Sequence, residues 1–215
     1  MNTASKLWLP PAPESYKRNQ YPYLVGICGK AGAGKDTLAV PFHDYGFRQF
    51  SFAHPLKMAV EFLFGISGYS INDRELKDST NHFWHKSPRE ILQFVGTDIC
   101  REYFGPDFWI RRMELEFILH FNTPQGVRAV ISDVRFTNEA EWILAAGGKL
   151  IHLTRPSLSG TVGIPSHPSE AGIDFNSLLQ YKESIYEIVN DSSISSLHQQ
   201  AVQFIRNPSN RFLFT

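Results

Sequence analysis

A glycine-rich segment that follows a short apolar run constrains the fold of this chain most. The apolar run covers residues 23–28, and residues 29–37 then read GKAGAGKDT, which matches GxxxxGK[ST] except that Asp36 replaces the hydroxyl residue. Glycines let successive backbone N–H groups point at a polyphosphate, and Lys35 can reach its terminal phosphates. We therefore expect a strand, a phosphate-binding loop and a helix in this order. The alternative is a glycine-rich turn without a ligand.

Two acidic residues are candidates for the surroundings of such a phosphate. Asp36 can contribute to a magnesium shell directly or through water, or it can merely compensate the helix N-terminus. Asp133 ends the apolar run 130–133, as does the acid that lies beside magnesium in proteins with this loop. Its alternative role is to cap the next helix.

The rest of the chain alternates short apolar runs with helical patterns. We expect further strands at 47–52, 129–134, 150–153 and 185–189. We expect helices at 35–44, 55–64, 87–100, 107–120, 138–146 and 197–205, with a loop at 65–86. This alternation requires right-handed crossovers, which predicts an α/β fold of three layers with a mainly parallel sheet flanked by helices. Residues 1–21 show no sustained period and are expected to form a flexible N-terminal extension of a domain over 22–215.

The helix expected at 87–100 has a strong start signal. Ser87 suits the N-cap, Pro88 the first helical position and Glu90 the third position of a capping box. At 100° per residue, one face carries apolar side chains that we expect in the core, namely Ile91, Leu92, Val95 and Ile99. The opposite face, which could meet a ligand, carries Arg89, Gln93, Gly96 and Cys100.

Charge and hydropathy exclude several classes of partner. The 21 basic and 21 acidic residues cancel, so no uniform field holds nucleic acid or an anionic membrane. No apolar run approaches the ~20 residues of a membrane span, and the N-terminus lacks an apolar signal core. We expect a cytoplasmic protein with small-molecule substrates and neither nucleic acid nor membrane as a partner, and we leave the choice between monomer and homodimer open.

Three arginines and one tryptophan are further site candidates. Arg89, Arg135 and Arg155 could clamp phosphates through bidentate contacts, although a solvated surface role is the more common one for any single arginine. Trp109 could stack on a base, or simply pack in the core.

The order of several motifs carries a family resemblance over residues 23 to about 206. The motifs are GKAGAGKDT, SFAHPLK, SPREILQFVGTD, DFWIRR, VISDVRFTNEAE, GGKLIHLTRP, SHPSEAG and VND. Together they resemble the deoxynucleoside monophosphate kinases of the tailed-phage type, within the P-loop kinase superfamily. The resemblance implies that the γ-phosphoryl group of ATP is transferred to a deoxynucleoside monophosphate (dNMP), giving a diphosphate and ADP. It thus implies ATP and Mg²⁺ as ligands and a role in deoxynucleotide supply for phage DNA synthesis in the host cytoplasm.

The resemblance also implies positions for the functional residues. The ATP and magnesium site would comprise Lys30, Ala31, Gly32, Ala33, Gly34, Lys35, Asp36 and Thr37, with Asn190 and Asp191 near adenine. The monophosphate site, in a segment of about 53–112, would comprise Ala53, Leu56, Lys57, Arg74, Arg89, Gly96, Thr97, Trp109, Asp133, Arg135 and Glu139. The catalytic group would be Lys35, Asp133, Arg135 and Arg155. A lid would span about 155–175 and include His167 and Glu170.

The implied reaction needs no dedicated general base, because the attacking phosphate oxygen is already anionic. Two other hypotheses stay open at this point. One is a P-loop kinase for another phosphorylated small molecule, such as phosphomevalonate. The other is a regulatory module that binds ATP without turnover.

Overall fold

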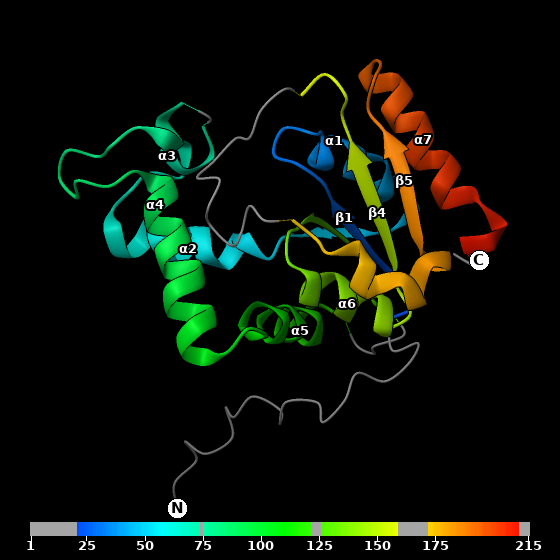
Figure 1. Cartoon of the computed structure of the whole chain (residues 1–215), viewed down its shortest axis with the longest axis horizontal. Helices are drawn as coiled ribbons and strands as arrows, with labels where there is room; N and C mark the ends of the chain where they lie inside the picture. The colour runs from blue at the N-terminus through cyan, green and yellow to red at the C-terminus, as the bar shows by residue number, and fades with distance from the viewer. Residues whose placement is uncertain (1–20, 74, 122–125, 159–171, 211–215) are drawn as a thin grey trace, which may run out of the picture.

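A five-stranded sheet forms the centre of the computed structural model, which describes residues 21–73, 75–121, 126–158 and 172–210 (Figure 1). The strands are all parallel, in the order β2-β3-β1-β4-β5. They are β1 (Tyr23–Cys28), β2 (Arg48–Phe50), β3 (Arg128–Val134), β4 (Lys149–Thr154) and β5 (Ile185–Val189). The expected parallel sheet is confirmed, and β1 lies at its centre.

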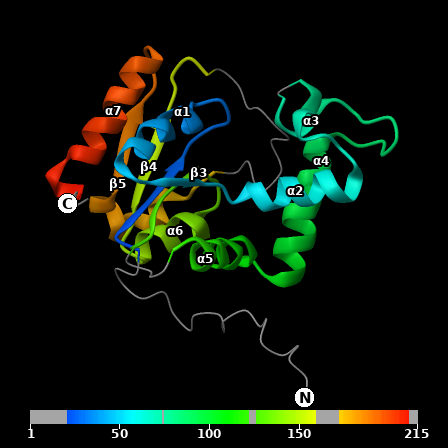
Figure 2. The same cartoon turned by 180° about the vertical axis from the view of Figure 1, so that it is seen from behind.

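Both faces of the sheet are covered by helices. Successive side chains of a strand point to opposite faces, so Leu24 and Cys28 of β1 join one core cluster and Val25 and Ile27 join the other. The first face packs against α5 (Phe108–His120) and α6 (Thr137–Ala145), and the second against α1 (Lys35–Ala39) and α7 (Ile194–Arg206). Figure 2 shows the same arrangement from behind. Burial on both faces explains why the strands read as continuous apolar runs.

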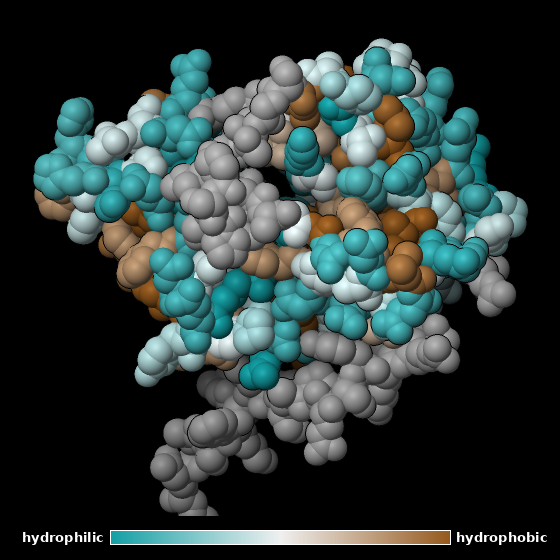
Figure 3. Space-filling model, in the orientation of Figure 1, coloured by the Kyte–Doolittle hydropathy of each residue, from teal (hydrophilic) through white to brown (hydrophobic). Residues whose placement is uncertain are grey.

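A helical lobe lies beside the sheet. It contains α2 (Ala53–Phe64), α3 (Gly68–Asn72), α4 (Pro88–Gln93) and a π-helix over Phe94–Tyr103 that continues α4. The lobe has a small core of its own, formed by Val60, Ile66, Ile71, Ile91 and Leu92. Figure 3 shows hydrophobic side chains along the outer flank of this lobe, and further hydrophobic side chains over the part of the molecule that holds the sheet. The lobe falls within the segment 53–112 expected to hold the monophosphate.

The expectation of a plain loop at 65–86 is wrong. This stretch contains α3 and a 3-10 turn over Leu76–Asp78. Ser67 caps α3 by accepting a hydrogen bond from Ser70 N. Asp73 Oδ1 accepts hydrogen bonds from Glu75 N and Leu76 N at the start of the 3-10 turn. Such short polar elements bury too few residues to produce an apolar period, so the sequence pattern does not reveal them.

The helix expected at 87–100 begins as predicted but continues differently. The Ser87 cap, Pro88 and the capping box with Glu90 are all present. From Phe94 the chain forms a π-helix, whose i→i+5 turns are wider than those of an α-helix. The wider turns change the phase of the side chains, so Ile99 is 39% exposed instead of lying in the core.

The remaining expected elements are found within a few residues of their expected bounds. The helix expected at 35–44 is divided into α1 and a 3-10 helix over Val40–Tyr45, since Pro41 has no N–H for an α-helical hydrogen bond. Tyr21, the last residue of the expected N-terminal extension, is buried against Phe117 and Trp142. The rest of the expected extension, residues 1–20, lies outside the described residues. Within the described ranges, no helix has both the length and the apolar character of a membrane span.

Gly29 provides a test of how tightly the loop after β1 packs on β4. Its φ is +143°, and a Cβ at this position would lie 2.2 Å from the carbonyl oxygen of Leu153. We expect Gly29→Ala to lower the free energy of unfolding by about 3 kcal/mol, measured by urea denaturation. Gly105 is a matched control, because its φ is +106° and no atom lies within 4 Å of the place where its Cβ would be.

For Gly105→Ala we expect a loss of about 1 kcal/mol, from backbone strain alone. Equal losses for the two variants would contradict the close approach of Gly29 to β4.

Candidate active site

The loop between β1 and α1 has the geometry of a phosphate nest. Gly29, Gly32 and Gly34 all have positive φ, which turns the backbone N–H groups of the loop inward. The Nζ of Lys35 donates hydrogen bonds to the carbonyl oxygens of Gly29 (2.9 Å) and Lys30 (3.0 Å), so its side chain lies across the loop. Burial, and then the nearby Arg135, lower the pKa of Lys35. The negative charge of an anion in the loop would oppose both effects and raise this pKa again.

A cavity of about 440 Å³ lies between this loop and the helical lobe. That volume falls within the roughly 300–1,000 Å³ typical of small-molecule sites. Most of the residues predicted for the two substrates line it together: Ala31, Gly32, Lys35, Asp36, Ala53, Leu56, Lys57, Arg89, Gly96, Thr97, Trp109, Asp133, Arg135 and Glu139. The cavity therefore joins the predicted ATP loop to the predicted monophosphate residues, which come from distant parts of the sequence.

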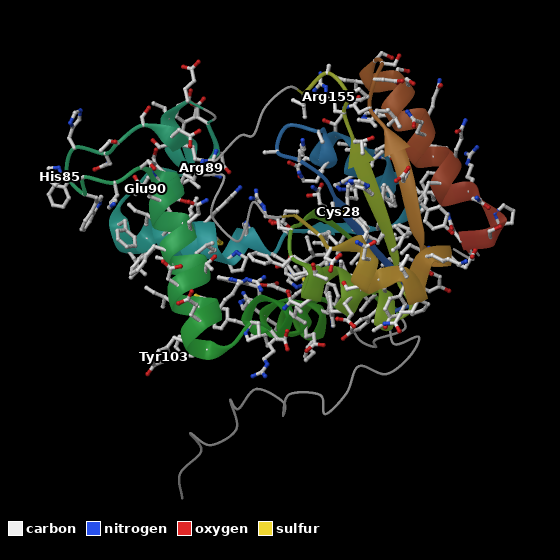
Figure 4. The ribbon with its side chains drawn as sticks, viewed as in Figure 1. Cys28, His85, Arg89, Glu90, Tyr103 and Arg155 are labelled. Carbon is white, nitrogen blue, oxygen red and sulfur yellow. The ribbon has the colours of Figure 1, made fainter. Side chains whose placement is uncertain are left out.

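The other predicted residues lie around the loop or outside the described chain. Arg155 Nη1 donates to the carbonyl oxygen of Gly32 (3.3 Å), and Figure 4 shows Arg155 at the end of β4 beside the loop. Asn190 Nδ2 donates to the carbonyl oxygen of Ala33 (2.7 Å). Four predicted residues belong to the loop and α1 but do not line the cavity: Lys30, Ala33, Gly34 and Thr37. Asp191 is exposed. Arg74, His167 and Glu170 lie outside the described residues.

Asp36 is held by two residues that no sequence pattern singles out. Its Oδ1 accepts hydrogen bonds from Ser132 Oγ (2.6 Å) and Gln49 Nε2 (3.3 Å). Oxygen donors of this kind suit Mg²⁺, which commonly binds one or two carboxylates together with phosphate oxygens and water. In the described chain no three His, Cys, Asp or Glu residues form a metal cluster, so a cation here would depend on phosphate and water ligands. The residues present fit that arrangement.

Asp133 anchors the start of the helical lobe. Its Oδ1 accepts from Phe52 N (2.8 Å), and its Oδ2 accepts from Ser51 Oγ (2.7 Å) and Ala53 N (2.9 Å). The sequence predicts that Asp133 lies beside magnesium or caps the helix that follows it. In the structure its carboxylate caps the N-terminus of α2, a helix that precedes it in the sequence.

Glu139 and Arg101 form a buried ion pair at the floor of the cavity. Glu139 Oε2 also accepts hydrogen bonds from Arg135 N (2.9 Å) and Phe136 N (3.1 Å). Arg101 lies 3.7 Å from the centre of the Phe136 ring and donates to the carbonyl oxygen of Pro106 (2.7 Å). Burial raises the pKa of Glu139 to about 7, against the opposing effect of Arg101. The pair fixes the backbone that carries Arg135.

Arg101 is not among the predicted site residues, because an α-helical period does not place it with the other ligand-facing residues. Arg89, Gln93, Thr97 and Arg101 all line the cavity at steps of four residues. Four residues of α-helix overshoot a full turn by about 40°. The wider turns over Phe94–Tyr103 compensate for this drift and keep the four side chains on one face.

Lys77 is a second site residue that the sequence does not predict. It lies in the segment expected to be a loop, and it lines the cavity. Burial, followed by the charges of Lys57, Arg89 and Arg135, lowers the pKa of Lys77 to about 8. Asp78 pairs with Arg89 and so fixes the turn that carries Lys77.

The cavity lining is therefore strongly cationic although the whole chain is neutral. Six basic side chains and three carboxylates line it, and two of the carboxylates are engaged by Arg101 and by the start of α2. Cations that lower one another's pKa values are stabilised when an anion binds among them. The arrangement can hold two phosphate groups, one in the loop and one near Lys77 and Arg89.

The family model and the curated relatives that match the sequence point to one family. Residues 63–201 match the family model described as "Deoxynucleotide monophosphate kinase". A protein of Acanthamoeba polyphaga mimivirus named "Putative deoxynucleotide monophosphate kinase" is 34% identical over 197 residues, which cover 86% of this chain and 97% of that protein.

More distant relatives carry similar names. The "Deoxynucleoside-5'-monophosphate kinase" of Escherichia phage T5 is 26% identical over 70% of this chain and 84% of its own length. The "Deoxynucleotide monophosphate kinase" of Escherichia phage RB69 is 29% identical over 65% of this chain, which matches about half (55%) of that protein. Among solved structures, dephospho-CoA kinase from Campylobacter jejuni aligns with 16% identity and a TM-score of 0.46, covering 89% of this chain and 99% of that one.

The buried ion pair gives a prediction with a defined pH dependence. Arg101→Met leaves Glu139 buried without its cation, and we expect it to lower the free energy of unfolding by about 3–5 kcal/mol at pH 8. At pH 5 the loss is smaller, because a carboxyl whose pKa is raised on folding is protonated there and carries no uncompensated charge. Urea denaturation at both pH values measures the difference.

The double variant Arg101→Met/Glu139→Gln is the control, since it removes both charges and should recover much of the loss at pH 8. A deficit that is the same at both pH values in the single variant would contradict an uncompensated carboxylate as its cause.

Proposed function

Because this chain belongs to the deoxynucleotide monophosphate kinase family, we propose that it transfers the γ-phosphoryl group of ATP to the 5′-phosphate of a dNMP. The products are a deoxynucleoside diphosphate and ADP, which places the reaction in the supply of DNA precursors. The observation that carries this proposal is the cavity in which Lys35 of the phosphate loop meets Lys57, Lys77, Arg89 and Arg135. Such a cavity suits a reaction that brings two phosphate groups together.

The residues of the cavity supply what this reaction requires. An oxygen of the acceptor phosphate forms a bond to the γ-phosphorus, and the bond between that phosphorus and the bridging oxygen of ADP breaks. The acceptor oxygen is already anionic, so positioning and positive charge are needed more than a base. We assign Lys35 and Arg135 to the transferring group, with Arg155 beside the loop, and Lys77 and Arg89 to the acceptor phosphate.

The ATP side of the site uses the loop and its neighbours. Backbone N–H groups of residues 30–37 would bind the phosphates, and Asn190 and Asp191 after β5 would lie near adenine. Bound Mg²⁺ would neutralise charge on the phosphates, and Asp36, oriented by Ser132, is the residue that would hold it. Asp133 and Glu139 act here as positioning residues, through the start of α2 and the backbone of Arg135.

The same assignment gives separate roles to two segments of the chain, the lobe and residues 155–175. The lobe within 53–112 holds the acceptor, and the segment 155–175 closes over the transferring group, which would keep water from it. Most of that second segment lies outside the described residues, so its role stays a prediction from the sequence.

The decisive experiment is ADP release from Mg-ATP against a panel of deoxynucleoside monophosphates, ribonucleoside monophosphates and phosphomevalonate. We expect turnover with one or more dNMPs, and we expect Lys35→Met to lower kcat by at least about 100-fold. Lys182→Ala, at an exposed lysine of the 3-10 helix over Phe175–Ser184, is the control and should behave as the wild type.

Two other outcomes would overturn the proposal. Turnover with phosphomevalonate alone would identify a kinase for another phosphorylated small molecule. ATP binding without turnover on any acceptor would identify a regulatory module.

Lys77 gives a prediction for the pH dependence of acceptor binding. A lysine with a pKa of about 8 is charged below that pH and loses its charge as the pH rises through it. We therefore expect the KM for the dNMP to rise above pH 8 in the wild type, as one cation facing the phosphate is lost. In Lys77→Met we expect a KM raised about tenfold at pH 7 and no further rise near pH 8.

Lys86→Met is the matched control from the same lobe, because Lys86 is exposed and pairs with Glu90 on the surface. An unchanged pH profile in Lys77→Met would assign the rise in KM to another group.

A further inference from the structure

The side-chain amide of Gln93 is buried in the cavity without a partner. Gln93 is the last residue of α4 and lines the cavity. Neither its Nε2 nor its Oε1 has a hydrogen bond to any described residue, although both atoms are inaccessible to solvent. An unpaired buried polar group destabilises a folded protein, and native proteins pair nearly all such groups. A ligand that offers a donor and an acceptor side by side would satisfy both atoms.

The position of Gln93 relative to the cationic residues indicates which part of a ligand reaches it. Arg89 precedes Gln93 by one helical turn, a rise of roughly 5–6 Å. Figure 4 shows Arg89 on the side of α4 that faces the sheet, whereas Glu90 points away from it. A nucleotide with its phosphate at Arg89 and Lys77 therefore extends its sugar and base along α4 toward Gln93.

The lining around Gln93 suits a base rather than a second phosphate. Leu56, Leu92 and Trp109 line the cavity, and Leu56 packs on Gly96, three residues after Gln93: its Cδ2 would lie 2.6 Å from a Cβ added to Gly96. Trp109 Nε1 already donates to the carbonyl oxygen of Gly96 (2.9 Å), so the indole offers its ring and not its N–H. Gln93 thus brings both a donor and an acceptor to a mostly apolar end of the cavity.

On the basis of the proposed function, we propose that Gln93 is a specificity-determining residue whose amide pairs with the edge of the acceptor base. Each of the four bases presents an adjacent donor and acceptor: N6–H and N1 of adenine, N4–H and N3 of cytosine, N1–H and O6 of guanine, and N3–H and O4 of thymine. A glutamine amide has one acceptor and two donor hydrogens, and rotation of its terminal group by a half turn reverses their order. Gln93 can therefore satisfy either order, which predicts that more than one base is accepted.

The test compares kcat and KM for dAMP, dCMP, dGMP and dTMP in the wild type and two variants. Gln93→Met removes both hydrogen bonds at similar volume, and we expect it to raise the KM of every accepted dNMP about tenfold while kcat changes less than about threefold. Gln93→Glu can only accept, and guanine alone presents two adjacent donors, N1–H and N2–H. We expect this variant to raise the ratio of kcat/KM for dGMP to that for dTMP at least about tenfold.

A purely structural role of Gln93 would lower activity toward all four substrates alike, so the change in their ranking is the deciding measurement. An unchanged ranking in Gln93→Glu, with an unchanged Tm, would overturn the proposal. If Gln93→Glu folds poorly, Gln93→Asn decides in its place: its amide is one methylene shorter, and it should disfavour the smaller pyrimidines relative to the purines. Gln199→Met, at an exposed glutamine of α7, is the control.

Failure of this inference can be told apart from failure of the proposed function. A wild-type protein that turns over dNMPs, with variants whose ranking does not change, overturns the role of Gln93 alone. A wild-type protein that phosphorylates no dNMP overturns both.

Discussion

The buried contact between Arg101 and Glu139 joins the two parts of the molecule on which the cavity depends. Arg101 belongs to the π-helix of the lobe, and Glu139 belongs to α6, which follows β3. The second oxygen of Glu139 receives the backbone N–H of Arg135, while Asp133 at the end of β3 holds the first residues of α2. Two carboxylates six residues apart thus fasten the beginning of the lobe to β3 and its end to α6, and Arg135 lies between them in the sequence.

This attachment explains how a chain without net charge can maintain a strongly cationic cavity. Lys35 and Arg135 follow the neighbouring strands β1 and β3, whereas Lys77 belongs to the lobe and approaches them only because the lobe is fixed to the sheet. Burial, and after it the charges of neighbouring cations, lowers the pKa values of Lys35 and Lys77, so this arrangement is unfavourable without an anion. The stability gained from burial elsewhere must offset that repulsion until phosphates bind.

Sequence patterns predict the parts of this structure that depend on local interactions. The phosphate loop, the capping box at Ser87 and the buried strands each follow from a few neighbouring residues, and all of them are present. Lys77 and Arg101 could not be found in this way. Lys77 lies in a polar turn without an apolar period, and Arg101 reaches the cavity only through the wide turns of the π-helix. The contact of Ser132 with Asp36 joins residues 96 positions apart, and no local pattern encodes it.

The π-helix makes the connection between lobe and sheet depend on the number of residues as well as on their identity. Its wider turns hold the direction of Arg101 in step with that of Arg89, twelve positions earlier in the chain. Loss of a single residue between Phe94 and Arg101 would rotate everything beyond it by roughly a quarter of a turn and turn Arg101 away from Glu139. Insertions and deletions should therefore be tolerated less well in this helix than many substitutions. The number of residues in the segment is then under selection in its own right.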